Sequence, residues 1–479
     1  MGILTHCKKE SILHFVGIGG IGMSGIAKVL FNRGYCVQGS DHQETETTKK
    51  LRNLGIKVFI GHQKENVKKA RVVVISSAIS SNNPEIIAAR EYRIPVIPRA
   101  EMLGELMRGK VGIAVAGTHG KTTTTSMLAT ILVHAQLDPT LVIGGKVDSF
   151  GGNAKLGQGE LVVVEADESD GSFLHLPATF GVITNIDQDH LNYFKSIQKI
   201  EDYFIRFVER IPFYGLVAVC GEDGGVKRCL TRFTKPYATY GFSEEFDLFA
   251  KNIEIHGFQS SFEVWFREQH WKNTHKKLGK IKLSVPGNHN ILNALASILI
   301  ALQLKIPFSQ ISQSLEAFQG VRRRFEIKWS SLKHNQMIID DYGHHPVEMA
   351  ATLQAIRTGW QGRIITVVQP HRYTRTLDCW DHFDFGLSQL SQSDIVFMMD
   401  IYPAGEPPIL GVNAERLVEH LKDKIPAKVI YGGGMQKTIE EVLQCFSSQD
   451  LVICFGAGSI THLSEDLAVK MKNAELSMV

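Results

Sequence analysis

A glycine-rich segment followed by Lys and Thr has the residue types of a phosphate-binding loop. Residues 116–124 read Ala-Gly-Thr-His-Gly-Lys-Thr-Thr-Thr, between an apolar run and a helix-like run. In this layout backbone N–H groups and a helix N-terminus face the phosphates, Lys121 adds a positive charge, and the Thr122 hydroxyl can hold Mg²⁺. Gly117 and Gly120 enclose two residues rather than four, which points away from generic GTPases and kinases. The alternative is a tight strand–helix turn with a surface lysine.

A second glycine loop follows the first apolar strand, 12–16. Residues 17–22 carry a G-x-G-x-x-G pattern, and Asp41 follows the next strand, 35–39. By itself this pattern predicts a dinucleotide site with Asp41 on a ribose, and its alternative is close strand–helix packing without a ligand. Two phosphate loops about a hundred residues apart favour two phosphate-bearing ligands held by two domains.

Acidic residues and a histidine follow two strands of the second block. The segment 165–170 reads Glu-Ala-Asp-Glu-Ser-Asp, and the segment 184–190 ends in Asp-Gln-Asp-His. Open α/β sheets bind ligands at the carboxyl ends of their strands, and several carboxylates there are costly without a cation. We therefore predict a Mg²⁺ site with Glu165 and His190, and the alternative is a solvated acidic loop.

The last third of the chain repeats this arrangement. Polar clusters follow four apolar strands. Arg372 and Arg375, in the second cluster, are suited to bidentate hydrogen bonding with a carboxylate or phosphate. Four clusters at four strand ends favour a ligand site over unrelated surface loops. The clusters span residues 340–346, 369–375, 400–406 and 455–459.

The elements that must position these residues alternate between strands and helices, which predicts an α/β protein with mostly parallel sheets. We expect domains at 1–108, 109–325 and 326–479. The strands are expected at 12–16, 35–39, 57–60, 72–76, 95–97, 111–116, 161–165, 180–184, 215–219, 336–340, 363–368, 394–398, 428–431 and 450–455, with a variable β region over about 237–285 and a buried helix over 286–301.

Composition excludes several classes of function. The chain has 479 residues, 44% of them hydrophobic and 21% charged, with a net charge of +3. This charge is too small to favour nucleic acid or a membrane surface, and the apolar runs are too short to span a bilayer. Seven scattered cysteines without a C-x-x-C pair predict core thiols in a reducing cytoplasm.

Taken together, the motifs resemble those of the Mur ligases, the ATP-dependent amide-forming enzymes of peptidoglycan synthesis. The resemblance covers almost the whole chain. It implies a Rossmann-like N-terminal domain for a UDP-sugar, a P-loop-type ATPase central domain, and a Rossmann-like C-terminal domain that binds the amino acid. The motifs that carry it are Gly-Thr-His-Gly-Lys-Thr-Thr-Thr, Glu-Ala-Asp-Glu-Ser-Asp, Thr-Asn-Ile-Asp-x-Asp-His, His-Asn-x-x-Asn-Ala, Arg-Arg-Phe-Glu, Asp-Asp-Tyr-Gly-His-His-Pro and Gln-Pro-His-Arg-Tyr-Thr-Arg, in that order.

The resemblance also implies a role for individual residues, with ATP and Mg²⁺ as cofactors and UDP-N-acetylmuramate and L-alanine as substrates. The resemblance implies catalytic roles for Lys121, His190, His344, Arg372 and Arg375. It implies metal binding by Thr122, Glu165 and His190. ATP binding falls on Gly117, Thr118, His119, Gly120, Lys121, Thr122, Thr123, Asn290, Asn293, Arg324, Asp341 and Tyr342. Substrate binding falls on Gly17, Gly19, Gly20, Gly22, Ser24, Asp41, His62, Ser77, Asn153, Lys155, His371, Arg372 and Arg375, with Ser40 also near the nucleotide.

Alternatives stay open within and outside this family. The resemblance favours the alanine-adding branch over the branch that recycles a preformed tripeptide, and only the amine donor separates the two. Asn192 stands where the family often has an acid, which puts that acid's role in doubt, and we assign no carbamoylated lysine. An NAD-dependent oxidoreductase and a non-catalytic nucleotide-binding regulator are the rivals from other classes. We expect a monomer or weak homodimer.

Overall fold

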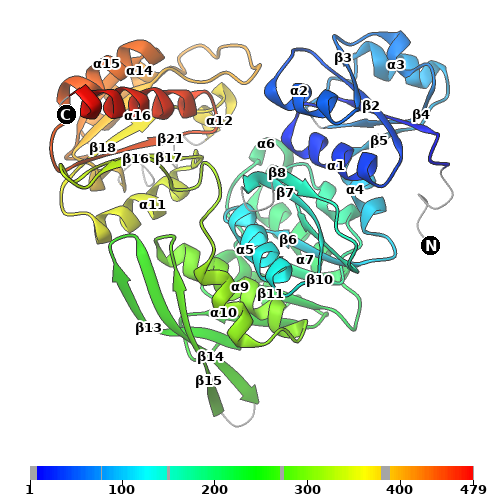
Figure 1. The fold of residues 1–479 in the computed structure, drawn as a ribbon, viewed down its shortest axis with the longest axis horizontal. Helices are drawn as coiled ribbons and strands as arrows, with labels where there is room; N and C mark the ends of the chain where they lie inside the picture. Colours follow the sequence, from blue (N-terminus) through cyan, green and yellow to red (C-terminus); the bar gives the residue numbers. More distant parts are fainter. Residues whose placement is uncertain (1–7, 77, 148–151, 270–273, 379–388, 478–479) are drawn as a thin grey trace. The chain divides into compact units, whose positions relative to one another are not determined.

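The computed structural model describes residues 8–76, 78–147, 152–269, 274–378 and 389–477, in which three β-sheets are flanked by helices (Figure 1). The chain forms two compact units. The first contains residues 1–252, 262–281 and 291–318, and the second contains residues 253–261, 282–290 and 319–479. The expected α/β class with mostly parallel sheets is confirmed.

The first sheet has five parallel strands in the order β3-β2-β1-β4-β5. The order reverses beside β1, which is where doubly wound sheets bind their ligands. The loop after β1 is the glycine loop 17–22. The strands are β1 (Ile12–Val16), β2 (Cys36–Asp41), β3 (Lys57–Ile60), β4 (Ala70–Ile75) and β5 (Val96–Pro98); the helices are α1 (Ile21–Asn32), α2 (Glu46–Asn53), η2 (Lys64–Val67), α3 (Pro84–Glu91) and α4 (Arg99–Met107).

The second sheet has ten strands in the order β15-β14-β13-β12-β11-β10-β6-β9-β7-β8. Its central strands are apolar on both faces because helices cover both sides: Val162, Val163 and Val164 of β9 are each 0% exposed. The strands are β6 (Val111–Ala116), β7 (Thr140–Val147), β8 (Gly152–Lys155), β9 (Leu161–Glu165), β10 (Phe180–Ile183), β11 (Leu216–Cys220), β12 (Tyr237–Gly241), β13 (Leu248–His256), β14 (Gln259–Gln269) and β15 (Thr274–Leu283). The helices are α5 (Lys121–His134), η4 (Ser172–His175), α6 (Leu191–Phe194), α7 (Ile197–Glu209), α8 (Gly224–Leu230), α9 (Asn288–Gln303) and α10 (Phe308–Glu316).

The third sheet has six strands in the order β16-β17-β21-β18-β19-β20, parallel except for β16. The carboxyl ends of β17, β18 and β21 lie side by side because these strands are neighbours in register. The strands are β16 (Glu326–Ser331), β17 (Gln336–Asp341), β18 (Arg363–Val368), β19 (Ile395–Met399), β20 (Lys428–Gly433) and β21 (Asp450–Phe455); the helices are α11 (Pro346–Gly359), α12 (Tyr373–Asp378), η5 (Gln389–Gln392), α14 (Ala414–Lys422), α15 (Met435–Cys445) and α16 (Ile460–Ser477).

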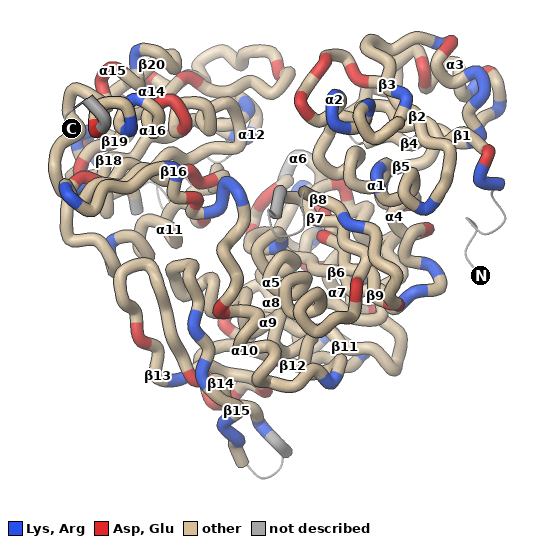
Figure 2. The backbone as a smooth tube through the Cα atoms, in the orientation of Figure 1, with Lys and Arg blue, Asp and Glu red and all other residues tan. Residues whose placement is uncertain are grey.

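The first and second sheets share one compact unit because helix α1 packs on the hairpin β7–β8. Asn153 Nδ2 donates to the carbonyl oxygen of Ile21 at 2.6 Å, and a Cβ on Gly25 would lie 3.3 Å from the Ala154 Cβ. The glycine in α1 therefore permits close approach of the hairpin. Positive and negative residues are interspersed along the tube in Figure 2, as the small net charge leads one to expect.

Two structural features differ from the sequence expectation. The hairpin β7–β8 was not predicted, because its glycine-rich strands resemble a loop. Strand β16 was not predicted either, and it adds an antiparallel edge to the third sheet. The other predicted strands agree with the structure to within one or two residues, and the predicted helix 286–301 begins at Asn288. Among the described residues, no helix is both long and apolar enough to cross a membrane.

Candidate active site

The glycine loop between β6 and α5 has a backbone that favours glycine at two positions. Gly117 has φ 132° and Gly120 has φ 82°, both in the left-handed region. A Cβ on Gly117 would lie 2.0 Å from Thr184 Oγ1, and a Cβ on Gly120 would lie 2.7 Å from Asn293 Oδ1. The end of β10 and helix α9 therefore pack directly against the loop and fix its shape.

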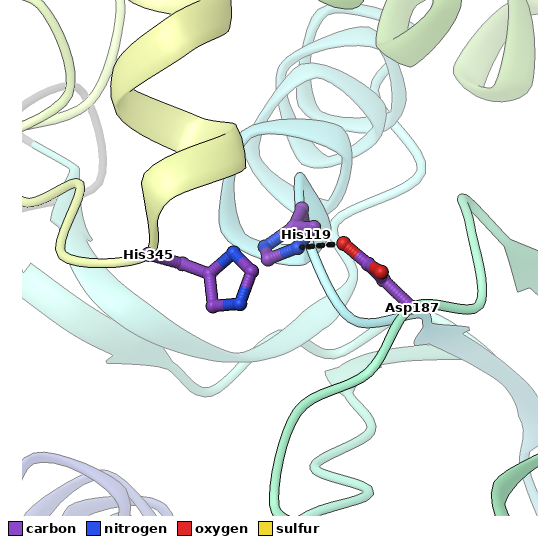
Figure 3. Close-up of side chains that lie close together, drawn as sticks. All are labelled: His119, Asp187 and His345. Atoms are coloured by element: carbon purple, nitrogen blue, oxygen red, sulfur yellow. Dashed lines mark hydrogen bonds and ion pairs between the residues drawn. The ribbon is translucent and has the colours of Figure 1, made fainter. Parts of the chain in front are cut away.

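The segment after β10 holds the loop by hydrogen bonds. Thr184 Oγ1 donates to the carbonyl oxygen of His119 at 2.6 Å, and the His119 N–H donates to Asn185 Oδ1 at 2.8 Å. The Asp187 N–H donates to Thr118 Oγ1 at 2.9 Å. His119 Nε2 lies 3.1 Å from Asp187 Oδ2, and Figure 3 shows this pair. These hydrogen bonds to the segment after β10 fix the positions of Thr118 and His119.

The Lys121 ammonium lies inside the loop and is paired with a carboxylate. Its Nζ donates to the carbonyl oxygens of Gly117 (2.5 Å) and Thr118 (3.0 Å) and to Glu168 Oε1 (2.9 Å). Burial disfavours the charge of Lys121, but Glu168 and Asp167 outweigh it and raise the pKa of the ammonium. Burial also raises the pKa of Glu168 to about 7. Lys121 therefore stays cationic, while its partner is a carboxyl group that is readily neutralised.

Thr122 and Glu165 are brought together as the sequence predicts for a metal site. Thr122 Oγ1 lies 3.1 and 3.0 Å from the two carboxylate oxygens of Glu165, and the Gly144 N–H donates to Glu165 Oε2 at 2.7 Å. A hydroxyl and a carboxylate are the hard oxygen ligands that Mg²⁺ prefers, so these two side chains fit that ion. Thr123 is half-buried in the same helical turn.

His190 follows the end of β10 in a strained conformation. Its φ is 56°, its N–H donates to Asp189 Oδ1 at 2.7 Å, and its Nε2 lies 3.5 Å from Asp189 Oδ2. The structure thus places this imidazole against a neighbouring carboxylate. The metal-binding role of His190 stays a prediction.

The two asparagines of the His-Asn-x-x-Asn motif fall in different compact units. Asn293 lies in the first unit, where its Oδ1 accepts a hydrogen bond from Thr124 Oγ1 at 3.0 Å, one turn into the helix that begins at Lys121. Asn290 lies in the second unit, where its Nδ2 donates to the carbonyl oxygen of Pro286 at 2.7 Å.

The glycine loop of the first domain is closed over Asp41. Gly17 has φ 75°, and the Gly19 N–H donates to Asp41 Oδ2 at 2.8 Å. A Cβ on Gly19 would lie 2.8 Å from the same oxygen, and a Cβ on Gly22 would lie 2.1 Å from Arg99 Nη1. One carboxylate oxygen of Asp41 is therefore used within the fold to hold the loop. Gly20 precedes the first turn of α1 as its N-cap.

The remaining predicted substrate residues fall in three places. Ser24 is buried in α1, and Asn153 Nδ2 lies 3.4 Å from its Oγ. Lys155 is paired with Asp138, with 3.2 Å between Nζ and Oδ1. His62 lies beside Ser40, with 3.0 Å between Nδ1 and Oγ. Ser77 lies outside the described residues.

In the second unit, the predicted site residues gather after β17. Asp341 accepts hydrogen bonds from the N–H groups of Phe325 (2.8 Å) and Gly343 (2.7 Å), and burial raises its pKa to about 6. The Arg324 guanidinium lies over the Tyr342 ring, 4.9 Å from its centroid. This segment therefore holds Arg324, Asp341 and Tyr342 in one cluster.

A small cavity of about 10 Å³ lies between the clusters 340–346 and 369–375 of this unit. His344, His371 and Arg375 line it, together with Met349 and Val368 from the core. Burial and the neighbouring arginines lower the pKa of His371 to about 4, so its imidazole is neutral at physiological pH. Arg372 is exposed, with its Nε 3.9 Å from Glu406 Oε1, and has φ 67°.

Three consecutive family models match this chain. They are the Mur ligase family catalytic domain at residues 12–111, the Mur ligase middle domain at 115–301, and the Mur ligase glutamate ligase domain at 323–458. The chain belongs to the Mur ligase family. The resemblance found in the motifs is thereby confirmed.

Individual relatives cover nearly the whole of this Mur ligase. It is 49% identical over 460 residues to the UDP-N-acetylmuramate–L-alanine ligase of Geotalea uraniireducens, covering 96% of this chain and 98% of the relative. The crystal structure of the UDP-N-acetylmuramate–alanine ligase from Thermotoga maritima matches with TM-score 0.79 and 30% identity, covering 96% and 99% of the two chains. A murein peptide ligase from Psychrobacter arcticus, with TM-score 0.69, 23% identity and coverage of 96% and 98%, shares the fold.

Several residues of the site were not singled out in the sequence. The sequence showed Glu168 only as one of a run of acids, and the structure pairs it with the Lys121 ammonium. Asn185 and Asp187 position the loop; they belong to the Thr-Asn-Ile-Asp-x-Asp-His motif, but no role was predicted for them. A cavity of about 390 Å³ beside the acidic segment was not predicted at all; it is lined by residues including Asp170, His175, Tyr203 and Arg206.

A pH-dependent loss of stability is expected from His289 of this Mur ligase. Burial lowers the pKa of His289 to about 4, below its unfolded value of about 6.5. The unfolded chain therefore binds a proton that the folded chain does not, and stability falls by about 1–3 kcal/mol as pH drops from about 6.5 to about 4. Urea unfolding across this range should show the loss in the wild type and a smaller loss in His289→Gln. An equal loss of unfolding free energy between pH 6.5 and pH 4 in both proteins would contradict the assignment to His289.

Proposed function

We propose that this Mur ligase joins L-alanine to the carboxylate of UDP-N-acetylmuramate in peptidoglycan precursor synthesis, consuming ATP with Mg²⁺ and releasing ADP and phosphate. The observation that carries the proposal is the loop in which Lys121 and the Thr122–Glu165 pair stand together. It occurs in a chain 49% identical, over 96% of its length, to a relative of that name. Such a reaction draws on cytoplasmic ATP and UDP-sugar, so we place it in the cytoplasm.

The chemistry follows from the low reactivity of a free carboxylate. A carboxylate oxygen of the UDP-sugar attacks the γ-phosphorus of ATP, the bond to the bridging oxygen breaks, and ADP leaves. The acyl phosphate carries a good leaving group, so the alanine amine can attack its carbonyl carbon. The tetrahedral intermediate then expels phosphate, and the nitrogen loses its proton as the amide forms.

The central domain supplies the charges that phosphoryl transfer requires. Lys121 exchanges Glu168 for the phosphate oxygens and offsets the negative charge that grows on them. When bound, Mg²⁺ supplies further positive charge at the outer phosphates, and Thr122 and Glu165 are the residues that would hold it. The left-handed turns at Gly117 and Gly120 shape the loop so that it leads into the N-terminus of α5 at Lys121, where phosphate would meet the positive end of the helix.

The C-terminal domain is proposed to bind the amino acid. The guanidinium groups of Arg372 and Arg375 can form bidentate hydrogen bonds with the carboxylate of the amino acid. His371 is neutral at physiological pH, so its imidazole does not repel the incoming ammonium group.

The test is phosphate release from ATP with Mg²⁺ and UDP-N-acetylmuramate across single amino acids and L-Ala-γ-D-Glu-meso-diaminopimelate. Release driven by L-alanine is expected. Release driven only by the tripeptide would assign the chain to the recycling branch, and release with neither donor would overturn the proposal. NAD binding in place of UDP-sugar binding would instead favour the oxidoreductase reading of the first glycine loop.

A further inference from the structure

A carboxylate is buried beneath the first sheet, and the proposed reaction leaves it without a role. Glu85 lies in the first turn of α3 and is 0% exposed. Its Oε1 accepts a hydrogen bond from Asn66 Nδ2 at 2.6 Å, and its Oε2 accepts one from Ser40 Oγ at 2.5 Å. A buried carboxylate of this kind is stable only when several donors face it.

The partners of Glu85 fix where each hydrogen lies. Gln38 Nε2 donates to the carbonyl oxygen of Asn66 at 2.7 Å and lies 3.1 Å from His14 Nδ1, which therefore accepts. The hydrogen of the neutral His14 ring then lies on Nε2, which is 3.4 Å from Glu85 Oε2. The hydroxyl hydrogen of Ser40 is directed to Glu85, so its oxygen keeps lone pairs for another donor.

His62 is the partly exposed end of this network. Its Nδ1 lies 3.0 Å from Ser40 Oγ and 3.2 Å from Glu85 Oε2, and both of these oxygens act as acceptors toward the ring. The hydrogen of the neutral imidazole must therefore lie on Nδ1. In this tautomer the Nε2 atom carries the lone pair of the ring, on a side chain that is 19% exposed.

The same network is tied to the glycine loop of the first domain. The carbonyl oxygen of Ser40 accepts hydrogen bonds from the N–H groups of Gly17 (2.8 Å) and Ile18 (3.0 Å). Gly61, next to His62, donates its N–H to the carbonyl oxygen of Asp41 at 2.7 Å. His62 therefore stands at the same carboxyl edge of the sheet as the phosphate-binding loop.

We propose that Glu85 is a positioning residue for the UDP-sugar: it holds His62 as the Nδ1–H tautomer, so that Nε2 accepts a hydrogen bond from the nucleoside. Donors of this class are the imide N–H of a uracil ring and the hydroxyls of a ribose. The proposal rests on the proposed function for the identity of the ligand, while the tautomer is a property of the chain alone. Burial raises the pKa of Glu85, but hydrogen bonds from His14, Ser40 and Asn66 outweigh it and lower the pKa, which keeps the acceptor charged.

Glu85→Gln tests the proposal because it replaces an acceptor with a donor at the same place. The amide oxygen can still accept from Asn66, and the amide NH₂ then faces Ser40 and His62. The hydrogen of His62 should move to Nε2, which ¹⁵N NMR of the substrate-free protein detects in the neutral ring. The KM for UDP-N-acetylmuramate should rise about tenfold or more, as for a lost hydrogen bond to a buried polar group. The KM values for ATP and L-alanine and the kcat should not change.

Asn66→Ala is the matched control. It also removes a buried hydrogen bond of Glu85, but from the oxygen that does not face His62. It should lower the free energy of unfolding while the His62 tautomer and the KM for the UDP-sugar stay unchanged.

Three results would overturn the proposal: an unchanged tautomer in Glu85→Gln, an equal rise of all three KM values, or an equal rise of the UDP-sugar KM in the control. Calorimetric binding of UDP gives the same comparison without turnover. Weaker UDP binding in Glu85→Gln supports the positioning role even if the wild type fails to use L-alanine, a failure that would overturn the proposed function alone.

Discussion

Lys121→Ala is expected to lower kcat by about 10²–10³-fold, the usual effect of removing one charged donor that faces developing charge. Lys121 is the ammonium held inside the glycine loop by two carbonyl oxygens and Glu168. Without it, negative charge on the transferring phosphoryl group has no fixed cation in the loop. Single-turnover phosphate release from ATP with UDP-N-acetylmuramate and L-alanine measures the effect, and near-normal turnover would rule out the role.

Two further variants separate catalysis from folding in this experiment. Lys121→Ala leaves Glu168 without its cation, so the double variant Lys121→Ala/Glu168→Gln removes the stranded carboxyl group as well. It should remain folded and stay inactive. Lys110→Ala removes a lysine at the opposite end of β6, where it is paired with exposed Glu160, and it should keep normal turnover. Recovery of turnover in the double variant would contradict the account.

Glu165→Gln is expected to lower kcat by about 10²-fold or more and to shift Mg²⁺ activation to higher concentration. Glu165 faces the Thr122 hydroxyl through both carboxylate oxygens and is anchored by the N–H of Gly144. The amide keeps the shape and the anchoring oxygen but loses the charge that attracts a divalent cation. Turnover is measured across a Mg²⁺ titration.

Glu160→Gln is the matched control for this variant because it changes an exposed glutamate just before the same strand. Its Mg²⁺ titration should match that of the wild type. If Glu165→Gln loses turnover but keeps the wild-type Mg²⁺ midpoint, Glu165 acts on something other than the ion, and the assignment of Thr122 and Glu165 as its ligands is wrong.

Local sequence patterns predicted the position of most chemical groups because parallel strands carry them to the carboxyl edge of their own sheet. Glu165 ends β9, Asp341 ends β17, and Lys121 begins α5, each as the apolar runs and glycine loops indicate. The hairpin β7–β8 was missed because Gly144 and Gly152 read as loop residues, whereas the structure uses Gly144 to let the strand approach the Glu165 carboxylate.

Pairings between distant residues could not be predicted in this way. Lys121 and Glu168 are 47 residues apart, and Ser40 and Glu85 are 45 residues apart. The local sequence around each residue predicts its place in a strand, loop or helix but does not identify its partner. The partners come together only when several strands and helices pack. The acidic segment 165–170 was therefore interpreted as a Mg²⁺ site with Glu165 as the ligand, and the pairing of Glu168 with Lys121 was not predicted.

The transfer of an ¹⁸O label tests the central claim most directly. UDP-N-acetylmuramate labelled in its carboxylate is incubated with the enzyme, Mg²⁺, ATP and L-alanine, and the released phosphate is examined by mass spectrometry. If the carboxylate attacks the γ-phosphate and the amine then attacks the acyl carbon, each released phosphate carries one labelled oxygen and the product contains an amide bond between the muramate carboxyl carbon and the alanine nitrogen. Unlabelled phosphate would show that ATP is hydrolysed without activating the carboxylate, and this result would contradict the proposed mechanism.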